Sequence, residues 1–213
     1  AGATAGVDVR FADPLTAAGT ATGCPCGKAL LDDLAMDWAE RLGPAAVVSE
    51  PDPWIERSFR ASLAYLLLMR DRVDDLWVVK PGAQSYNSFW YRDAAYIALA
   101  LDAAGLHDRA EESLRLFQRS PLPAEIEAMG TWGGTVAQQA DGRWECPGDE
   151  HDGTGQALWA LVGHAELAGD DAWLRQAWPS IRRGAGWLEG ACRSTIGGEH
   201  AGSTHEGLLP EGY

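Results

Sequence analysis

The stretches ALALDAAGLHDRAEESLRLF (98–117) and VGHAELAGDDAWLRQAWPSI (162–181) match each other at an offset of 64 residues. The offset aligns glycine with glycine and apolar residues with apolar residues: Gly105 with Gly169, Leu114 with Trp178, and Phe117 with Ile181. On both sides of each glycine, apolar residues recur every three to four positions, which is the spacing of a helix with one buried face. Each stretch therefore predicts two helices joined by a glycine turn, an αα-hairpin.

The same spacing predicts six helices in all, arranged as three hairpins. They are bounded by start and stop signals: the first stops at GP (43–44), the second begins after SEPDP (49–53), the third is capped by Asn87 or Ser88, the fourth ends at SPLP (120–123), and the fifth runs from about Asp152 to Ala168. Hairpins of this kind bury a continuous core by stacking on their neighbours. The pattern predicts an all-α fold of about three stacked αα-hairpins.

Outside the helical segments, the chain carries few structural signals. Residues 1–26 lack periodicity and are rich in Gly, Ala and Thr, so we expect an extended or disordered arm there, followed by one domain over 27–213. Strand signals are scarce: GTVAQQ and RWEC, within 134–146, predict at most one small β-hairpin in the long connection 120–151. A connection of that length inside a domain is usually functional.

The composition is that of an ordinary globular chain, with 46% hydrophobic and 23% charged residues. The formal net charge of −14 is spread along the sequence. It argues against nucleic acid and anionic membrane surfaces as partners, because both need a basic face. No apolar stretch reaches the ~18 residues of a membrane span, so a soluble protein is expected. The start of the chain shows no signal-peptide pattern, and the residues indicate no compartment.

The cysteines and histidines do not form an evident metal site. Cysteines stand at positions 24, 26, 146 and 192. The two cysteines of CPC (24–26) could be metal ligands, but neither a second close cysteine pair nor a histidine pair supplies the remaining ligands of a metal site. The glycine-rich segment 197–213 holds two histidines and three glutamates without helical spacing, and we expect it to be a loop that lines the rim of a site. No metal and no cofactor are expected.

The stretch YNSFWYRDAAY (86–96) places Trp90, Arg92 and Asp93 at the start of the third predicted helix. One interpretation is structural: Trp90 packs in the core, and Asp93 is favourable near the positive end of the helix. The other is functional, because a sugar stacks its C–H face on an aromatic ring and pairs its hydroxyls with carboxylate and guanidinium groups. The residues themselves leave both interpretations open.

The stretch GDEHDGTGQALWAL (148–161) sets three carboxylates, Asp149, Glu150 and Asp152, in front of an amphipathic helix. One acid is enough to cap a helix, and Asp152 is well placed for that role. Three acids within four residues repel one another, however, and clustered carboxyls that are partly removed from water hold a proton more readily, as a general acid requires. Aromatic residues nearby would supply apolar walls: Trp132, Trp144 and Trp159.

The segments FWYRDAAYIALALDAAGLHDRA and DEHDGTGQALWALVGHAELAGD resemble the six-hairpin glycosidases, the (α/α)6-barrel enzymes that include glucoamylases and trehalases. In that fold, six hairpins close into a toroid of inner and outer helices, with the pocket at one end of the inner ring. The resemblance covers roughly residues 50–213. It implies an exo-acting, inverting glycoside hydrolase with a carbohydrate substrate.

The resemblance also implies roles for individual residues. The W-x-R-D motif that holds the sugar in glucoamylases matches Trp90, Arg92 and Asp93. For the catalytic acid, Glu150 ranks first because it resembles the acid of bacterial E-x-D-G-x-G-Q variants, Asp152 ranks second, and Asp149 matches in a third alignment. Further residues are expected to contact the sugar: Tyr91, Trp144 and Gln156.

The sequence departs from the family in holding about three hairpins where the family has six, so it predicts part of an (α/α)6 toroid. The family's second carboxylate, the base that activates water, comes from the later hairpins, and no residue here matches it. Since an inverting glycosidase needs two carboxyls about 6.5–9.5 Å apart, the chain alone is expected to be inactive. Its open hairpin faces would be covered by the missing half of the barrel or by self-association.

Two alternatives differ in class from a glycosidase. The main one is a non-catalytic helical-hairpin module that binds a glycan or a protein, which the unmatched base favours. A terpenoid or lanthionine cyclase on a similar toroid is disfavoured, because the sequence has no DDxxD element and no zinc-ligand set.

Overall fold

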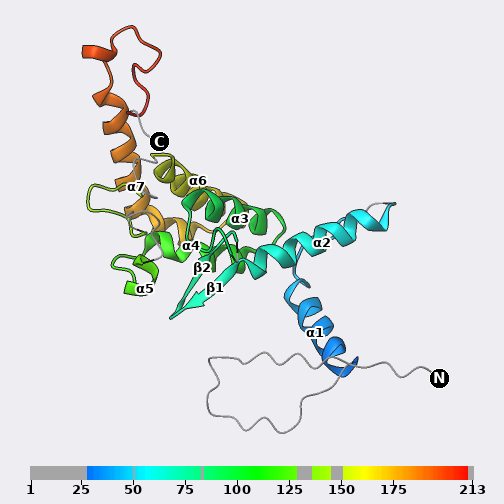
Figure 1. Ribbon diagram of the computed structural model, residues 1–213. Helices are drawn as coiled ribbons and strands as arrows, with labels where there is room; N and C mark the ends of the chain where they lie inside the picture. The colour runs from blue at the N-terminus through cyan, green and yellow to red at the C-terminus, as the bar shows by residue number, and fades with distance from the viewer. Residues whose placement is uncertain (1–27, 50, 83, 129–135, 145–150, 211–213) are drawn as a thin grey trace, which may run out of the picture. The chain divides into compact units, whose positions relative to one another are not determined.

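The computed structural model describes residues 28–49, 51–82, 84–128, 136–144 and 151–210. The elements in chain order are α1 (Lys28–Arg41), α2 (Pro53–Leu68), β1 (Arg70–Val73), β2 (Leu76–Val79), α3 (Tyr91–Ala103), α4 (His107–Gln118), α5 (Ala124–Glu127), α6 (Asp152–Ala168), α7 (Asp171–Ser194) and the 3-10 turn η2 (Gly198–His200). Helices dominate, and two short strands form a single antiparallel ribbon (Figure 1). The predicted all-α class with one small β-hairpin is confirmed.

The chain divides into two compact units, residues 1–44 and 45–213. Helix α1 belongs to the first unit and ends at Arg41, just before the predicted stop signal at 43–44. The predicted arm of residues 1–26 lies outside the described residues. All the other elements belong to the second unit.

The 64-residue repeat corresponds to two αα-hairpins, α3–α4 and α6–α7. Helix α4 begins at His107 and α7 at Asp171, and each follows a glycine in the left-handed region, Gly105 with φ +80° and Gly169 with φ +64°. Glycine adopts this conformation without the steric cost that a Cβ would add. The two hairpins and their glycine turns are therefore as predicted.

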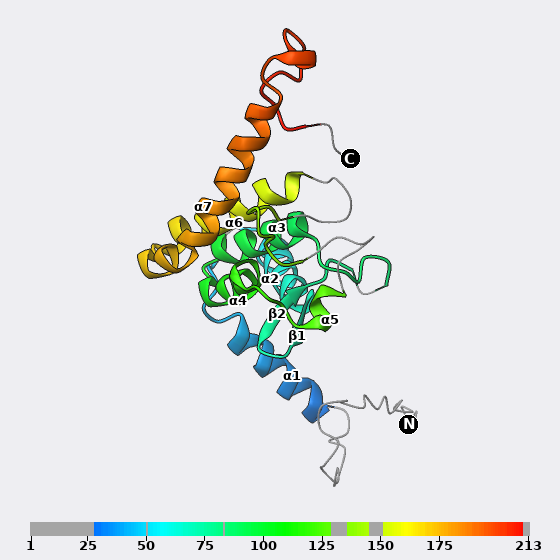
Figure 2. The same ribbon diagram turned by 90° about the vertical axis from the view of Figure 1, so that its left-hand side faces the viewer.

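Helices α3 and α6 lie side by side at the centre of the second unit (Figures 1 and 2). Helix α3 packs against α4 and α6, while α6 packs against α7 and α4. Arg92 near the start of α3 contacts Asp152 at the start of α6, and Asp102 near the end of α3 contacts His164 toward the end of α6. The two helices therefore run parallel and begin at the same end.

The carboxyl-terminal end of this pair is closed by a buried polar cluster. Asp102 is 2% exposed and His164 is 1% exposed. His164 Nδ1 lies 2.9 Å from each oxygen of the Asp102 carboxylate, and His107 Nδ1 lies 2.9 Å from Oδ1. Trp173 packs its ring edge-on against His164, with 4.9 Å between centroids. Because buried polar groups need partners of this kind, the cluster holds α3, α4, α6 and α7 together.

The start of α3 differs from the prediction. Neither Asn87 nor Ser88 caps it, since the helix begins at Tyr91 and the residue before it occupies the N-cap position without a side-chain cap. The physical reason is Phe89, which is fully buried and packs edge-on against the ring of Phe117, with 5.8 Å between centroids. An extended backbone before the helix turns this ring into the core.

The described β-hairpin lies between α2 and α3, and no strand occurs in the described residues of the 120–151 connection, where a hairpin was predicted. The two strands pair in the register Arg70↔Val79, Asp71↔Val78, Arg72↔Trp77 and Val73↔Leu76. Asp74 takes φ +53° in the turn, a conformation that Asp tolerates better than most residues. Apolar residues on both strands are buried, and together they supply the strand pattern: Val73, Leu76, Val78 and Val79.

Residues 136–144, which belong to the predicted hairpin, form a turn instead. Within this described segment no strand occurs. Backbone bonds close the turn, from Gln139 N to Arg143 O (2.9 Å) and from Gly142 N to Gln139 O (3.0 Å). Gln138 Nε2 donates to Gly142 O (2.8 Å) and to Ser180 O on α7 (2.9 Å), which ties the turn to that helix. Val136 and Trp144 are both buried at the ends of this turn. Tertiary packing has overridden a local strand preference.

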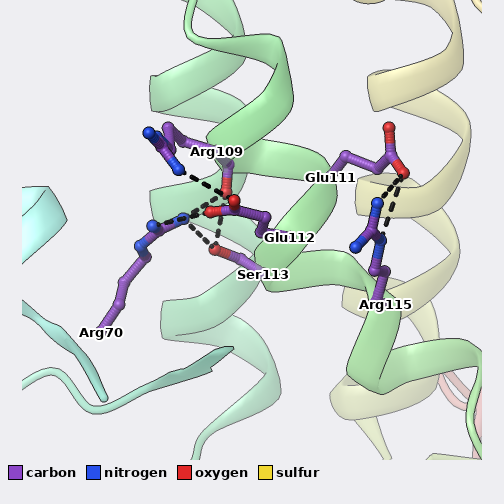
Figure 3. Close-up of polar contacts among 6 residues, drawn as sticks. All are labelled: Arg70, Arg109, Glu111, Glu112, Ser113 and Arg115. Atoms are coloured by element: carbon purple, nitrogen blue, oxygen red, sulfur yellow. Dashed lines mark hydrogen bonds and ion pairs between the residues drawn. The ribbon is translucent and has the colours of Figure 1, made fainter. Parts of the chain in front are cut away.

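A buried arginine holds the β-hairpin against α4 (Figure 3). Arg70 donates through Nη1 to Arg109 O (2.5 Å) and Ser113 Oγ (3.2 Å), and through Nη2 to Glu112 Oε2 (3.1 Å). Its guanidinium also lies 4.8 Å from the ring centroid of Trp77. Burial lowers the pKa of Arg70, and the Glu112 carboxylate opposes that effect. The two terminal nitrogens of the Arg70 guanidinium thus fix the ribbon beside α4, while its Nε is buried without a hydrogen-bond partner among the described residues.

Candidate functional site

The starts of α3 and α6 bring together the two clusters that the sequence singled out. Arg92 is the second residue of α3, and Asp152 is the first residue of α6. Arg92 Nη1 lies 2.5 Å from Asp152 Oδ2, and the two side chains are 45% and 43% exposed. A guanidinium and a carboxylate from different helices therefore meet at the open end of the α3–α6 pair, where a ligand can reach both.

A shallow hollow of about 350 Å³ lies next to this ion pair. The residues that line it come from both helices: Tyr96, Asp152, Gly155, Gln156 and Trp159. The rings of Tyr96 and Trp159 meet edge-to-face with 5.0 Å between centroids, although they are 57% and 47% exposed. The surface thus combines one aromatic pair with the carboxylate and amide groups that a polar ligand needs.

The other residues of the W-x-R-D motif lie at the start of α3. Trp90 occupies the N-cap position, and its ring meets the ring of Tyr86 at 6.4 Å between centroids. Its indole nitrogen is buried and has no hydrogen-bond partner among the residues described, an uncommon state for a buried donor. Asp93 is half-buried in the first turn of α3, where the helix dipole favours a carboxylate.

Tyr91 and Trp144, predicted to contact a sugar, are core residues in the structure. Tyr91 is 1% exposed, and its hydroxyl donates to Val136 O. Trp144 is fully buried, and its indole Nε1 donates to Phe117 O at 3.0 Å. The Thr154 hydroxyl bonds to the backbone N and O of Trp144, both at 3.0 Å. These residues hold the starts of α3 and α6 in place and do not line the hollow.

Of the three predicted acids, the structure describes one. Asp149 and Glu150 lie outside the described residues, so their roles remain predictions. Asp152 does not cap α6 as the structural interpretation proposed, because His151 occupies the N-cap position and no side-chain cap bond is made. The Asp152 carboxylate bonds to Arg92 instead. The His151 ring packs against the ring of Trp187 on α7, with 5.8 Å between centroids.

The segment after α7 is organised by its own polar contacts. Glu206 accepts hydrogen bonds from the backbone N–H of Gly202 (2.7 Å) and Gly197 (3.0 Å), and these bonds lower the pKa of its carboxyl. Thr195 Oγ1 lies 2.6 Å from Leu208 O. The expectation that this segment lines the rim of the site remains a prediction.

The sequence pattern did not single out two residues of the hollow, Tyr96 and Gly155. A signal for Tyr96 was present, because it stands four residues after Arg92 and such residues share one face of a helix. Gly155 is the second glycine of the E-x-D-G-x-G-Q pattern, but that pattern does not indicate that the residue lines a hollow. Within the described ranges, no group of three or more His, Cys, Asp or Glu is arranged to hold a metal ion, and no helix has the length and apolarity of a membrane span.

Comparisons with known proteins add one distant likeness. No family model and no solved structure matches the chain. A curated protein named "Uncharacterized glycosyl hydrolase MJ1610", from Methanocaldococcus jannaschii, is 26% identical over 132 residues. The match covers 61% of this chain and 20% of that protein, so the chain spans about a fifth of the length of its relative. The helical fold and this likeness both fit the suspicion of a glycoside hydrolase.

Proposed function

We propose that this chain carries the sugar-binding surface and the general acid of an exo-acting, inverting glycoside hydrolase. The observation that supports the proposal most is the contact between Arg92 and Asp152, because it joins two sequence clusters that are 60 residues apart. The distant relative named as a glycosyl hydrolase supports the same class of reaction. A carbohydrate is the proposed substrate.

The Arg92–Asp152 ion pair suggests different roles for Asp152 and Glu150. The Asp152 carboxylate is held by Arg92 Nη1 at 2.5 Å, and its oxygens are suited to accept hydrogen bonds from sugar hydroxyls. The proton donor to the leaving oxygen is then Glu150, which ranks first on the sequence pattern, with Asp149 as the other candidate. Arg92, Asp93 and Trp90 hold the sugar. The base that activates water is not matched in this sequence and would come from elsewhere in the barrel.

Hydrolysis of nitrophenyl glycosides and disaccharides by the full-length protein tests this assignment. We expect Glu150→Gln to lower kcat by about a hundredfold or more, since general acid catalysis contributes about 10²–10⁴-fold. Asp152→Asn should raise KM more than it lowers kcat, because it removes a binding contact. Glu166→Gln, an exposed change on the same helix, is the matched control. Equal activity of Glu150→Gln and wild type would refute the acid assignment.

A non-catalytic sugar-binding module is the second candidate, and the unmatched base favours it. It shares the Arg92–Asp152 surface with the first candidate but lacks turnover. Calorimetry separates the two: binding of a disaccharide without hydrolysis by the full-length protein would favour the module.

A further inference from the structure

Gly155 stands in the first turn of α6, where a glycine is unfavourable by about 1 kcal/mol relative to alanine. Two other glycines of these hairpins have an evident packing reason. A Cβ on Gly184 would lie 2.4 Å from a ring atom of Trp144, and one on Gly163 would lie 2.8 Å from Leu99. A Cβ on Gly155 would meet nothing within 4 Å. The backbone does not need this glycine either, because no positive φ is found there.

The space that Gly155 leaves empty is the hollow beside the ion pair. Asp152 lies three residues before it and Trp159 four residues after it, so all three share one face of α6. Any longer side chain at position 155 would project between the carboxylate and the indole. The glycine therefore keeps the Trp159 ring and the Asp152 carboxylate accessible to one ligand.

The groups around this space specify a neutral, hydroxyl-bearing ligand with an apolar face. Trp159 and Tyr96 offer two half-exposed rings, while Asp152 and Gln156 offer hydrogen-bond groups one turn away. The nearest cation, Arg92, is engaged by Asp152, and the chain carries a formal net charge of −14, so an anionic ligand is disfavoured. The volume of about 350 Å³ falls at the lower end of ligand pockets, which span about 300–1,000 Å³.

We propose that Gly155 holds open a subsite in which a pyranose ring stacks its C–H face on the aromatic pair Tyr96 and Trp159 and directs its hydroxyls to Asp152 and Gln156. This subsite deepens the proposed function and rests on it. It adds Tyr96, Gln156 and Trp159 to the Arg92–Asp152 pair as residues that contact the sugar. Gly155 is a specificity-determining residue, because the size of the side chain at this position sets how deeply a sugar ring enters.

The test fills the hollow without disturbing the fold. Gly155→Leu places a side chain in the open space. Gly190→Leu is its matched control, because Gly190 is also inside a helix, also has nothing within 4 Å of a Cβ, and does not line this hollow. Trp159→Ala is a second variant that removes the platform from a half-exposed position. Circular dichroism and thermal melting establish that each variant is folded.

Maltose, cellobiose and trehalose are the probes, offered to the full-length protein and measured by calorimetry and saturation-transfer NMR. We expect Gly155→Leu and Trp159→Ala each to weaken binding of the preferred sugar about tenfold or more, while Gly190→Leu stays within about twofold. In the NMR experiment, saturation should be transferred from the wild-type protein to the ring C–H protons on one face of the sugar. This transfer should be lost in Trp159→Ala.

The outcomes separate this inference from the function on which it rests. If a sugar is bound or hydrolysed and Gly155→Leu changes neither affinity nor KM, the ligand lies elsewhere; the subsite is then refuted while the proposed function stands. If the wild type neither binds nor hydrolyses any of the three sugars or the nitrophenyl glycosides, both proposals fail.

Discussion

At one end of the parallel helices α3 and α6, Asp102 meets His164 in a core where the two residues are 2% and 1% exposed. At the other end, Arg92 meets Asp152 with side chains that are 45% and 43% exposed. The chemistry of the two ends is similar, since each joins an acidic side chain to a basic one across the same helix pair. The surroundings differ, and they decide what each pair can do.

The closed end is saturated with partners from within the chain. Asp102 contacts both His164 and His107, and Trp173 covers the cluster. A ligand could enter only by breaking these bonds. The open end keeps an ion pair, two half-exposed rings and a vacant space at Gly155. Stability is therefore expected to depend on the closed end and ligand binding on the open end.

The largest effect on stability is expected from the closed end. Asp102→Ala leaves two histidines without their acceptor and should lower the free energy of unfolding by about 2–4 kcal/mol. Urea denaturation measures it. Asp108→Ala, an exposed change in the first turn of α4, serves as the control and should be nearly neutral. Similar midpoints for Asp102→Ala and Asp108→Ala would remove the contrast between the two ends.

A smaller loss is expected beneath the open end. Thr154→Val removes the hydroxyl that bonds to the backbone of Trp144 and should cost about 1–2 kcal/mol of unfolding free energy. Thr154→Ser keeps the hydroxyl and should retain most of the stability. If Thr154→Val and Thr154→Ser have the same free energy of unfolding, the hydroxyl does not stabilise the start of α6.

Substitution of Gly155 is expected to raise the free energy of unfolding, whereas the two changes above lower it. Gly155→Ala is expected to stabilise the protein by about 0.5–1 kcal/mol, because alanine favours a helix and its Cβ meets no neighbour. Gly184→Ala should destabilise it, since its Cβ would lie 2.4 Å from the Trp144 ring. Thermal melting of both variants decides the point. A destabilised Gly155→Ala would mean that the glycine serves packing after all.

The smallest effect on stability is expected from the Asp170 carboxylate, which caps the start of α7 near the closed end. The backbone N–H groups of Trp173 and Ala172 lower the pKa of Asp170 below its ordinary 3.8. A depressed folded-state pKa stabilises the fold above the unfolded value, and this contribution is lost as the pH falls through the folded value. Asp170→Ala should therefore melt lower than wild type at neutral pH, and the difference should shrink well below pH 3.8. A difference that persists in strong acid would contradict this cause.

The sequence was most informative where one residue decides the local backbone. Gly105 and Gly169 predicted the two hairpin turns, and the start of α6 at Asp152 was predicted from its apolar spacing. The β-hairpin of Arg70–Val79 was not predicted, and the described residues 136–144 of the predicted one form a turn in which Gln138 bonds to α7, a tertiary contact that no local pattern reveals. The start of α3 was misplaced for a similar reason, the burial of Phe89.

The site could be predicted only in part. Arg92, Asp152 and Gln156 were expected to be polar groups of one site, and the structure places them at one end of the helix pair. Trp144 looked like a sugar-binding wall, but burial depends on its contacts with Phe117 and Thr154, which are far from it in sequence. Gly155 belongs to the E-x-D-G-x-G-Q pattern, but the pattern alone does not show that its missing side chain leaves an open space.

A double-mutant cycle on sugar binding tests the central claim that Arg92 and Asp152 act together on one ligand. Calorimetry with the preferred disaccharide would compare Arg92→Ala, Asp152→Asn and the double variant with wild type. We predict that each single change weakens binding about tenfold or more, that the double variant is barely weaker than the worse single one, and that melting temperatures hardly move because an exposed ion pair contributes little stability. Wild-type affinity in both single variants would contradict the account.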